Sequence, residues 1–184
     1  MRLIALSVPI LAVVVLVVGC AETRFNQDTT NFHLTDLDGN PIALSDERFQ
    51  SKVVLIDIWG TWCPPCHEQI PYLIEFQDRY RAQGLEIIGV EFDMYTRGTE
   101  QERRDIMKEF VEETGINYTV ILGGEVNDVN SVFEGMQSFK GFPTTVLIGR
   151  DGLVRHVSWG FRKSDARKLE ENIRELLTED RAAR

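Results

Sequence analysis

Residues 53–59, VVLIDIW, form a nearly unbroken apolar run, and two cysteines follow it at positions 63 and 66. An apolar run of this kind is typical of a strand that is covered on both faces of a sheet. The sequence over 64–83 has helical periodicity, and Gly84 is a typical helix stop. The chain is therefore expected to turn from a buried strand into a helix at the cysteine pair.

The rest of the chain alternates further strand and helix signals. They predict a hairpin over 31–44 with a turn at 38–41, strands over 85–92 and 117–122, a short helix over 127–134 and a hairpin over 144–159. A longer helix is predicted to open at the capping box Thr99–Glu102, to end at Gly115 and to bury Ile106, Met107, Phe110 and Val111. A last helix is predicted from Ser164, with an apolar face of Ala166, Leu169, Ile173, Leu176 and Leu177. This order predicts an α/β fold with a mixed central sheet flanked by helices and an N-terminal β-hairpin, in one domain over 31–184.

The first nineteen residues differ in composition from the rest. Arg2 precedes an apolar run over 3–18, which is the layout of a secretory signal, and the run is shorter than the ~20 residues that a membrane-spanning helix needs. Its end, Val-Val-Gly-Cys, resembles a bacterial lipobox, so Cys20 is the expected lipid attachment site and residues 20–30 are the expected tether. The alternative is an uncleaved N-terminal anchor with an incidental cysteine. Both arrangements put the domain outside the cytoplasmic membrane.

The charge of the chain excludes one class of partner. It has 20 Lys and Arg against 29 Asp and Glu, a formal net charge of −9. Binding to the phosphate backbone of nucleic acids depends on positive charge, so no nucleic-acid partner is expected. With 184 residues, 43% of them hydrophobic, the chain can build a core of ordinary size without a disulfide framework.

The Cys63/Cys66 pair could be half of a metal site, a structural crosslink, or a dithiol that exchanges electrons. Structural zinc usually needs four ligands, and the sequence has no second Cys or Cys/His pair to complete them. Thiol exchange needs one exposed cysteine that is stabilised as a thiolate. Cys63 is expected to meet both conditions at the positive end of the helix, and Cys66, one turn later, is placed to resolve the mixed disulfide.

The residues between the cysteines, Pro64 and Pro65, lack the backbone N–H groups that could stabilise a thiolate at Cys63. We therefore expect the pKa of Cys63 in the upper part of the range of about 3.5 to 7.5 found for activated cysteines. A less stabilised thiolate makes a less oxidising couple, which favours a reductant.

Asp57 stands in the middle of the apolar run, six residues before Cys63. A carboxyl group there would be desolvated, which raises its pKa and suits it to take and return the proton of Cys66. The alternative is an aspartate at an edge or at a solvated end of the strand. The apolar neighbours on both sides favour the buried position.

The combination of VVLIDIWGTWCPPC, Pro71 five residues after the second cysteine, and GFPTTVLI, whose proline lies 80 residues after Cys63, resembles the thioredoxin superfamily. The likeness is to its TlpA- and ResA-like membrane-anchored branch, and it covers residues 31–177. It implies a thioredoxin-like fold and a redox-active CXXC disulfide.

The resemblance also implies roles for single residues. Cys63 matches the attacking cysteine, Cys66 the resolving one, and Asp57 the buried acid of thioredoxin itself. Pro143 matches the proline whose preceding peptide bond is cis. The substrate groove is expected to comprise Trp62, Pro64, Pro65, Phe142 and Pro143, where a client chain can pair with the backbone.

One position departs from the family pattern. ResA-like proteins commonly have a glutamate three residues after the second cysteine, and this chain has Gln69. Its neighbour Glu68 would point about a quarter turn away on a helix. Asp57 is therefore expected to take over the proton transfer, as in thioredoxin.

These observations predict an extracytoplasmic thiol-disulfide oxidoreductase, lipid-anchored to a bacterial membrane, that reduces protein disulfides. No cofactor or metal is expected, and the expected partners are disulfide-containing client proteins and a membrane dithiol that donates electrons to a monomer. The alternative is a thioredoxin-fold copper-binding protein that uses the two cysteines and His156. Such proteins use a wider cysteine spacing, and a histidine in a strand is more often a surface or groove residue.

Overall fold

The computed structural model describes residues 32–95, 98–133 and 139–179. The secretory signal, Cys20 and the tether all lie outside the described residues. Within the described ranges, no helix has the length and apolar character required to cross a bilayer.

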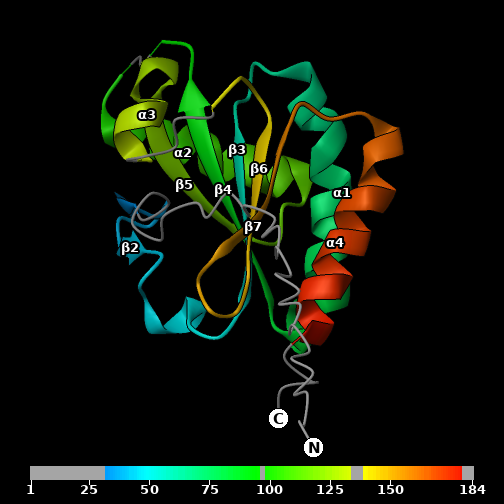
Figure 1. Cartoon of the computed structure of the whole chain (residues 1–184). Coiled ribbons are helices and arrows are strands. Elements are labelled where there is room, and N and C mark those ends of the chain that lie inside the picture. The colour runs from blue at the N-terminus through cyan, green and yellow to red at the C-terminus, as the bar shows by residue number, and fades with distance from the viewer. Residues whose placement is uncertain (1–31, 96–97, 134–138, 180–184) are drawn as a thin grey trace, which may run out of the picture.

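A five-stranded mixed sheet forms the centre of the molecule (Figure 1). Its strand order is β5-β4-β3-β6-β7. Strands β3, β4 and β5 run parallel to one another, and β6 is antiparallel to both of its neighbours, β3 and β7. The strands are β3 (Val53–Trp59), β4 (Leu85–Asp93), β5 (Thr119–Glu125), β6 (Thr144–Ile148) and β7 (Val154–Trp159). The predicted mixed sheet flanked by helices is thus confirmed.

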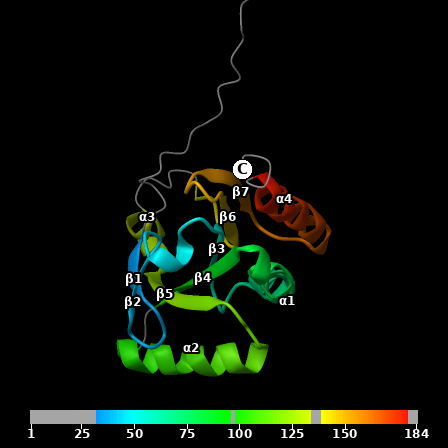
Figure 2. The same ribbon diagram turned by 90° about the horizontal axis from the view of Figure 1, so that it is seen from below.

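Helices and a hairpin cover the two faces of this sheet (Figure 2). On one face lie α1 (Pro64–Tyr80) and α4 (Ala166–Glu179), and α2 (Glu100–Thr114) packs at the β5 end. The other face carries α3 (Val129–Val132) and the separate two-stranded sheet of β1 (His33–Thr35) and β2 (Pro41–Ala43). Short 3-10 helices occur at Glu47–Phe49, Arg81–Gln83, Val126–Asp128 and Lys163–Asp165.

The two cores follow from alternation along β3. Val53, Leu55 and Trp59 join the cluster under α1 and α4, whereas Ile56 and Ile58 join the cluster under the hairpin. Every residue of β3 is buried, because the strand is central and both of its faces are covered. The strand limits predicted from the apolar run are confirmed.

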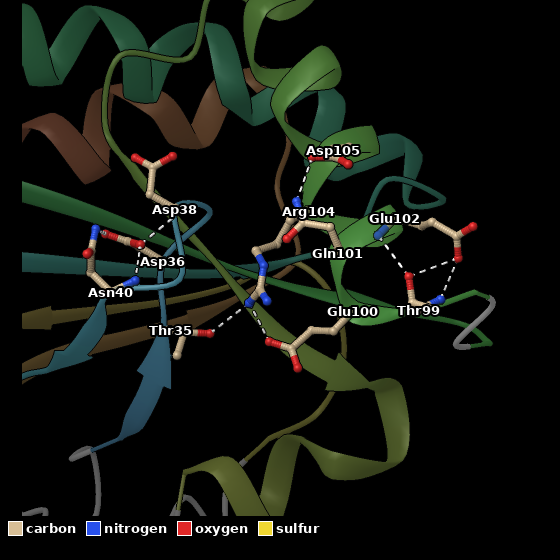
Figure 3. A network of polar contacts seen from close by, with 10 residues as sticks. All are labelled: Thr35, Asp36, Asp38, Asn40, Thr99, Glu100, Gln101, Glu102, Arg104 and Asp105. Atoms are coloured by element: carbon tan, nitrogen blue, oxygen red, sulfur yellow. Dashed lines mark hydrogen bonds and ion pairs between the residues drawn. The ribbon is translucent and has the colours of Figure 1, made fainter.

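The N-terminal hairpin is held by its own turn and by α2 (Figure 3). Within the turn, the Asp36 carboxylate accepts hydrogen bonds from the backbone N–H groups of Asp38 and Asn40, at 3.0 and 2.8 Å. Arg104 of α2 donates to Thr35 Oγ1 at 3.4 Å and pairs with Glu100 on its own helix. These contacts fix the predicted hairpin beside the sheet.

Helix α2 begins at the predicted capping box. Thr99 Oγ1 accepts from the Glu102 N–H at 3.2 Å, and the Glu102 carboxylate accepts from the Thr99 N–H at 2.6 Å (Figure 3). The prediction that Ile106 is buried is wrong, because its side chain is 65% exposed. The helix packs at the end of the sheet and buries only a narrow stripe, which includes Met107 and excludes Ile106, about 100° away around the axis.

The last third matches the prediction closely. The hairpin of β6 and β7 is confirmed, and all five apolar residues expected to face inward on the last helix are buried.

Strand β5 begins two residues later than predicted and continues through Gly123 and Gly124. Gly123 is required there, because a Cβ atom would lie 2.4 Å from the ring of Phe92.

Candidate active site

The two cysteines lie where β3 passes into α1. Cys63 is the N-cap residue of α1 in an extended conformation, and Pro64 and Pro65 occupy the first helical positions. Cys66 follows one turn later, with 5.3 Å between the two Cα atoms, and the sulfurs are joined in a disulfide. The expected redox-active pairing of Cys63 with Cys66 is therefore present at the expected junction.

The expectation that Cys63 is exposed is wrong for this disulfide form. Cys63 is 2% exposed and Cys66 is completely buried. Both belong to the apolar cluster under α1, and Phe142 packs against that cluster. The ring of Trp62 meets Phe142 edge-on at 5.0 Å between centroids, so aromatic side chains close this region.

The turn that carries Cys63 is held to the neighbouring strand β4. The Cys63 N–H donates to the Gly60 carbonyl at 3.1 Å, and the Trp62 indole N–H donates to the Phe92 carbonyl at 2.8 Å. The Thr61 carbonyl lies 2.6 Å from a ring nitrogen of His67, the residue after Cys66. Trp62 itself is 37% exposed.

Asp57 is completely buried on the central strand. In the strand register it lies opposite Gly89 of β4 and Thr145 of β6, and it shares the face of the sheet that carries Trp59 and the cysteine cluster. Neither of its carboxyl oxygens has a hydrogen-bond partner within the described residues, and burial raises its pKa to about 8. The buried position is confirmed, and the edge position is wrong.

Gln69 of α1 contacts β6, the strand beside the one that carries Asp57. Its side-chain amide donates to Thr145 Oγ1 at 2.8 Å, and the side chain is 1% exposed. Glu68 is exposed, as predicted from its position on the helix. An amide does not exchange protons near neutral pH, so the inward-facing position of α1 holds a hydrogen-bonding group and not an acid.

The peptide bond between Phe142 and Pro143 is cis, as the resemblance implied. Pro143 is buried and its carbonyl accepts from the Gly160 N–H at 2.7 Å, whereas Phe142 is partly exposed. Phe142 contacts the rings of Trp62 and Phe139, each at 5.0 Å between centroids. The surface beside the disulfide is thus aromatic.

A cavity of about 470 Å³ opens between β7 and α4. Its lining includes the buried Thr145 and Gln69 and the exposed Lys168. His156 also lines it, on β7 opposite Leu147. The described part of the chain contains no group of three His, Cys, Asp or Glu residues that could hold a metal ion, so the copper alternative gains no support.

The sequence reasoning missed a second buried acid, Glu91 on β4. It is 1% exposed, and its carboxylate accepts a hydrogen bond from the backbone N–H of Thr61. Burial and then the charge of Asp93 raise its pKa to about 8, against the opposing effects of the Thr61 hydrogen bond and Arg103. The signal was available, because Glu91 interrupts the apolar run LEIIGVEF as Asp57 interrupts VVLIDIW.

Thiol-disulfide oxidoreductases are among the known proteins that this chain resembles. The thiol-disulfide oxidoreductase ResA of Bacillus thuringiensis subsp. konkukian is 31% identical over 157 residues, which cover 84% of this chain and 80% of the relative. ResA of Geobacillus kaustophilus is 32% identical over 145 residues, 78% of this chain and 75% of the relative.

Solved structures show the same fold. The Chlorobium tepidum protein named as thiol:disulfide interchange protein DsbE has a TM-score of 0.65 and 30% identity, covering 81% of this chain and 94% of that one. The thioredoxin domain of a thiol-disulfide oxidoreductase from Bacteroides vulgatus has a TM-score of 0.61 and 27% identity, covering 79% and 94%. The Redoxin family model matches residues 23–174. With its thioredoxin-like fold and its CXXC disulfide, the chain belongs to the Redoxin family and is a thiol-disulfide oxidoreductase.

Proposed function

We propose that this oxidoreductase reduces disulfides of client proteins, with Cys63 as the attacking cysteine, Cys66 as the resolving cysteine and Asp57 as the proton-exchanging acid. The observation that carries the proposal is the cysteine pair in the first turn of α1, over a sheet face that buries Asp57. This arrangement supplies a nucleophile, a second thiol one turn away and a titrating group on the same side.

The exchange proceeds in two steps. The Cys63 thiolate attacks one sulfur of the client disulfide, a mixed disulfide forms, and the other client sulfur leaves as a thiolate. Cys66 then gives its proton to Asp57, attacks the Cys63 sulfur and releases the second client thiolate. Two electrons pass from the dithiol to the client, and the Cys63–Cys66 disulfide remains.

The pKa of Asp57 fits the second step. With a pKa of about 8, roughly a tenth of the carboxyl groups are ionised at pH 7 and can accept a proton. The same group can return the proton when the disulfide is reduced again. A pKa close to the working pH is the general requirement for such acid and base catalysis.

The direction proposed is reduction. Pro64 and Pro65 occupy the positions where N–H groups would otherwise stabilise a Cys63 thiolate, and Asp57 and Glu91 place acids on the same side of the sheet. A thiolate with few stabilising donors favours the disulfide form of the enzyme, and such a couple donates electrons.

We place this activity outside the cytoplasmic membrane. The sequence supports a secretory signal over 1–19, lipidation at Cys20 and a tether over 20–30, with electrons supplied by a membrane dithiol. The working unit is a monomer without a dissociable cofactor. Incorporation of labelled fatty acid that is lost in Cys20→Ser supports the anchor; equal labelling of both proteins contradicts it.

Trapping tests the assigned roles. Cys66→Ala is expected to accumulate mixed disulfides between Cys63 and client proteins, because the resolving thiol is missing. Cys63→Ala is the matched control and is expected to trap none. Mixed disulfides that form through Cys66 in Cys63→Ala, or none in either variant, would contradict the assignment. Identification of the captured chains names the clients.

A further inference from the structure

Glu91 and the active-site turn are in direct contact. Glu91 lies near the end of β4, opposite Trp59 of β3 in the strand register, and therefore on the face of the sheet that carries the cysteine cluster. Its carboxylate accepts the backbone N–H of Thr61, two residues before Cys63. Because Trp62 donates to the Phe92 carbonyl, two successive residues of the turn bind two successive residues of β4.

The backbone of Thr61 is held on both sides of its Cα atom. Its N–H bonds Glu91, and its carbonyl lies 2.6 Å from the ring nitrogen of His67 on α1. The turn has little freedom to move away from this contact. Gly60 shows how closely it is packed, because a Cβ atom there would lie 2.8 Å from the Phe92 carbonyl oxygen. A change in the charge of Glu91 is therefore transmitted directly to the segment that leads into Cys63.

Burial and the charged groups around Glu91 together raise the pKa of Glu91. The groups on the elements that pack around it are Asp57 on β3, Asp93 on β4, Arg103 on α2, His67 on α1, Glu125 on β5 and Tyr118 before β5. Arg103 lowers the pKa of Glu91, whereas Asp93 and burial raise it, and the net direction is upward, to about 8. One carboxyl oxygen, Oε1, is buried without a hydrogen-bond partner from any described residue.

We infer that Glu91 is a positioning residue of the dithiol centre, which fixes the Cys63 turn through the Thr61 amide and, through its own charge, sets how readily Cys63 ionises. This inference rests on the proposed role of Cys63. Protonated Glu91 adds no charge beside the turn. Ionised Glu91 adds a negative charge beside the turn, and this charge disfavours the ionisation of Cys63. It therefore supplies an acid near the dithiol in a chain whose α1 carries Gln69 at the inward-facing position.

The first test follows the contact in the disulfide form of the full chain. The amide proton shift of Thr61 is measured by NMR as a function of pH. It is expected to titrate with a midpoint near pH 8, to lose this transition in Glu91→Gln, and to keep it in Glu86→Gln, a control on the same strand at its other end. A Thr61 shift that titrates equally in Glu91→Gln overturns the inference.

The second test follows Cys63 in the reduced full chain, in the Asp57→Asn background so that Asp57 does not titrate. Alkylation by iodoacetamide is followed by mass spectrometry of the peptide that contains both Cys63 and Cys66, and fragment ions assign the label to Cys63. The rate is expected to rise with pH in two steps when Glu91 is present, because ionised Glu91 makes the thiolate more basic and more nucleophilic. Glu91→Gln is expected to leave one step.

These outcomes separate the two proposals. Superimposed alkylation profiles with and without Glu91 overturn the inference and leave the proposed function standing. A Cys63 that does not react at any pH up to 9 in either protein overturns the proposed function. Glu91→Gln keeps an oxygen that can accept the Thr61 N–H. A merely structural role of Glu91 would therefore leave the alkylation profile of Cys63 unchanged by this substitution.

Discussion

Asp57→Asn is expected to change the pH dependence of stability strongly. The pKa of Asp57 is 3.8 in an ordinary setting and about 8 in the folded protein. Between these values the unfolded chain releases the proton while the folded chain keeps it, so the wild-type protein loses stability as pH rises through this window. Below pH 3.8 both states hold the proton, and the group contributes no difference.

The magnitude follows from the two pKa values. Between the two pKa values, the free energy of unfolding falls by about 1.36 kcal/mol for each pH unit. The carboxyl group therefore costs the folded state about 4 kcal/mol more at pH 7 than at pH 4. The substitution removes this dependence. The introduced amide buries two polar hydrogens where the protonated carboxyl buries one, and this extra burial costs about 1–3 kcal/mol at every pH, so the net gain at pH 7 is about 1–3 kcal/mol.

The assay is urea unfolding of the disulfide form from pH 4 to pH 9. The difference in free energy of unfolding, variant minus wild type, is expected to grow by about 4 kcal/mol between pH 4 and pH 7 and to level off above pH 8. Glu113→Gln, an exposed carboxyl on α2, is the control and should show no such trend. A difference that is constant over the whole range would refute the protonated, buried state of Asp57.

Three further predictions follow from the packing around the site. Gln69→Glu adds an acid close to Asp57 and is expected to lower stability above pH 7 by about 1–3 kcal/mol, measured by urea unfolding, with an effect that fades toward pH 4; equal loss at all pH values would point to packing alone. Gly123→Ala is expected to cost about 1–3 kcal/mol, because the added Cβ would overlap a buried phenylalanine ring of β4; an unchanged melting temperature would contradict that close approach. Met107→Ala is expected to cost about 2–5 kcal/mol and Ile106→Ala less than about 0.5 kcal/mol, and the reverse order in thermal unfolding would mean that α2 buries a different face.

The central strand and its acid were predictable from the sequence for a definite reason. An unbroken apolar run requires cover on both faces, and a carboxyl group inside such a run has no route to solvent along the strand. Asp57 is therefore placed by its neighbours in the chain. Glu91 on β4 is placed in the same way by the apolar neighbours of the run LEIIGVEF.

Other features depend on contacts that are distant in sequence. The burial of Cys63 involves Phe142, which packs from a loop about 80 residues later, and no local pattern indicates it. The exposure of Ile106 depends on how much of α2 the sheet covers, which helical periodicity does not specify. The contact of Gln69 with Thr145 likewise joins α1 to β6 across the core.

The reduction potential of the Cys63–Cys66 couple tests the central claim most directly. The full chain is equilibrated in thiol redox buffers, and the oxidised fraction is read from alkylation of the peptide that contains both cysteines. A reversible two-electron couple more negative than about −230 mV is predicted, as expected for a reductant. A value between about −230 and −180 mV or higher, or a disulfide that does not exchange with the buffer thiols, would contradict the account.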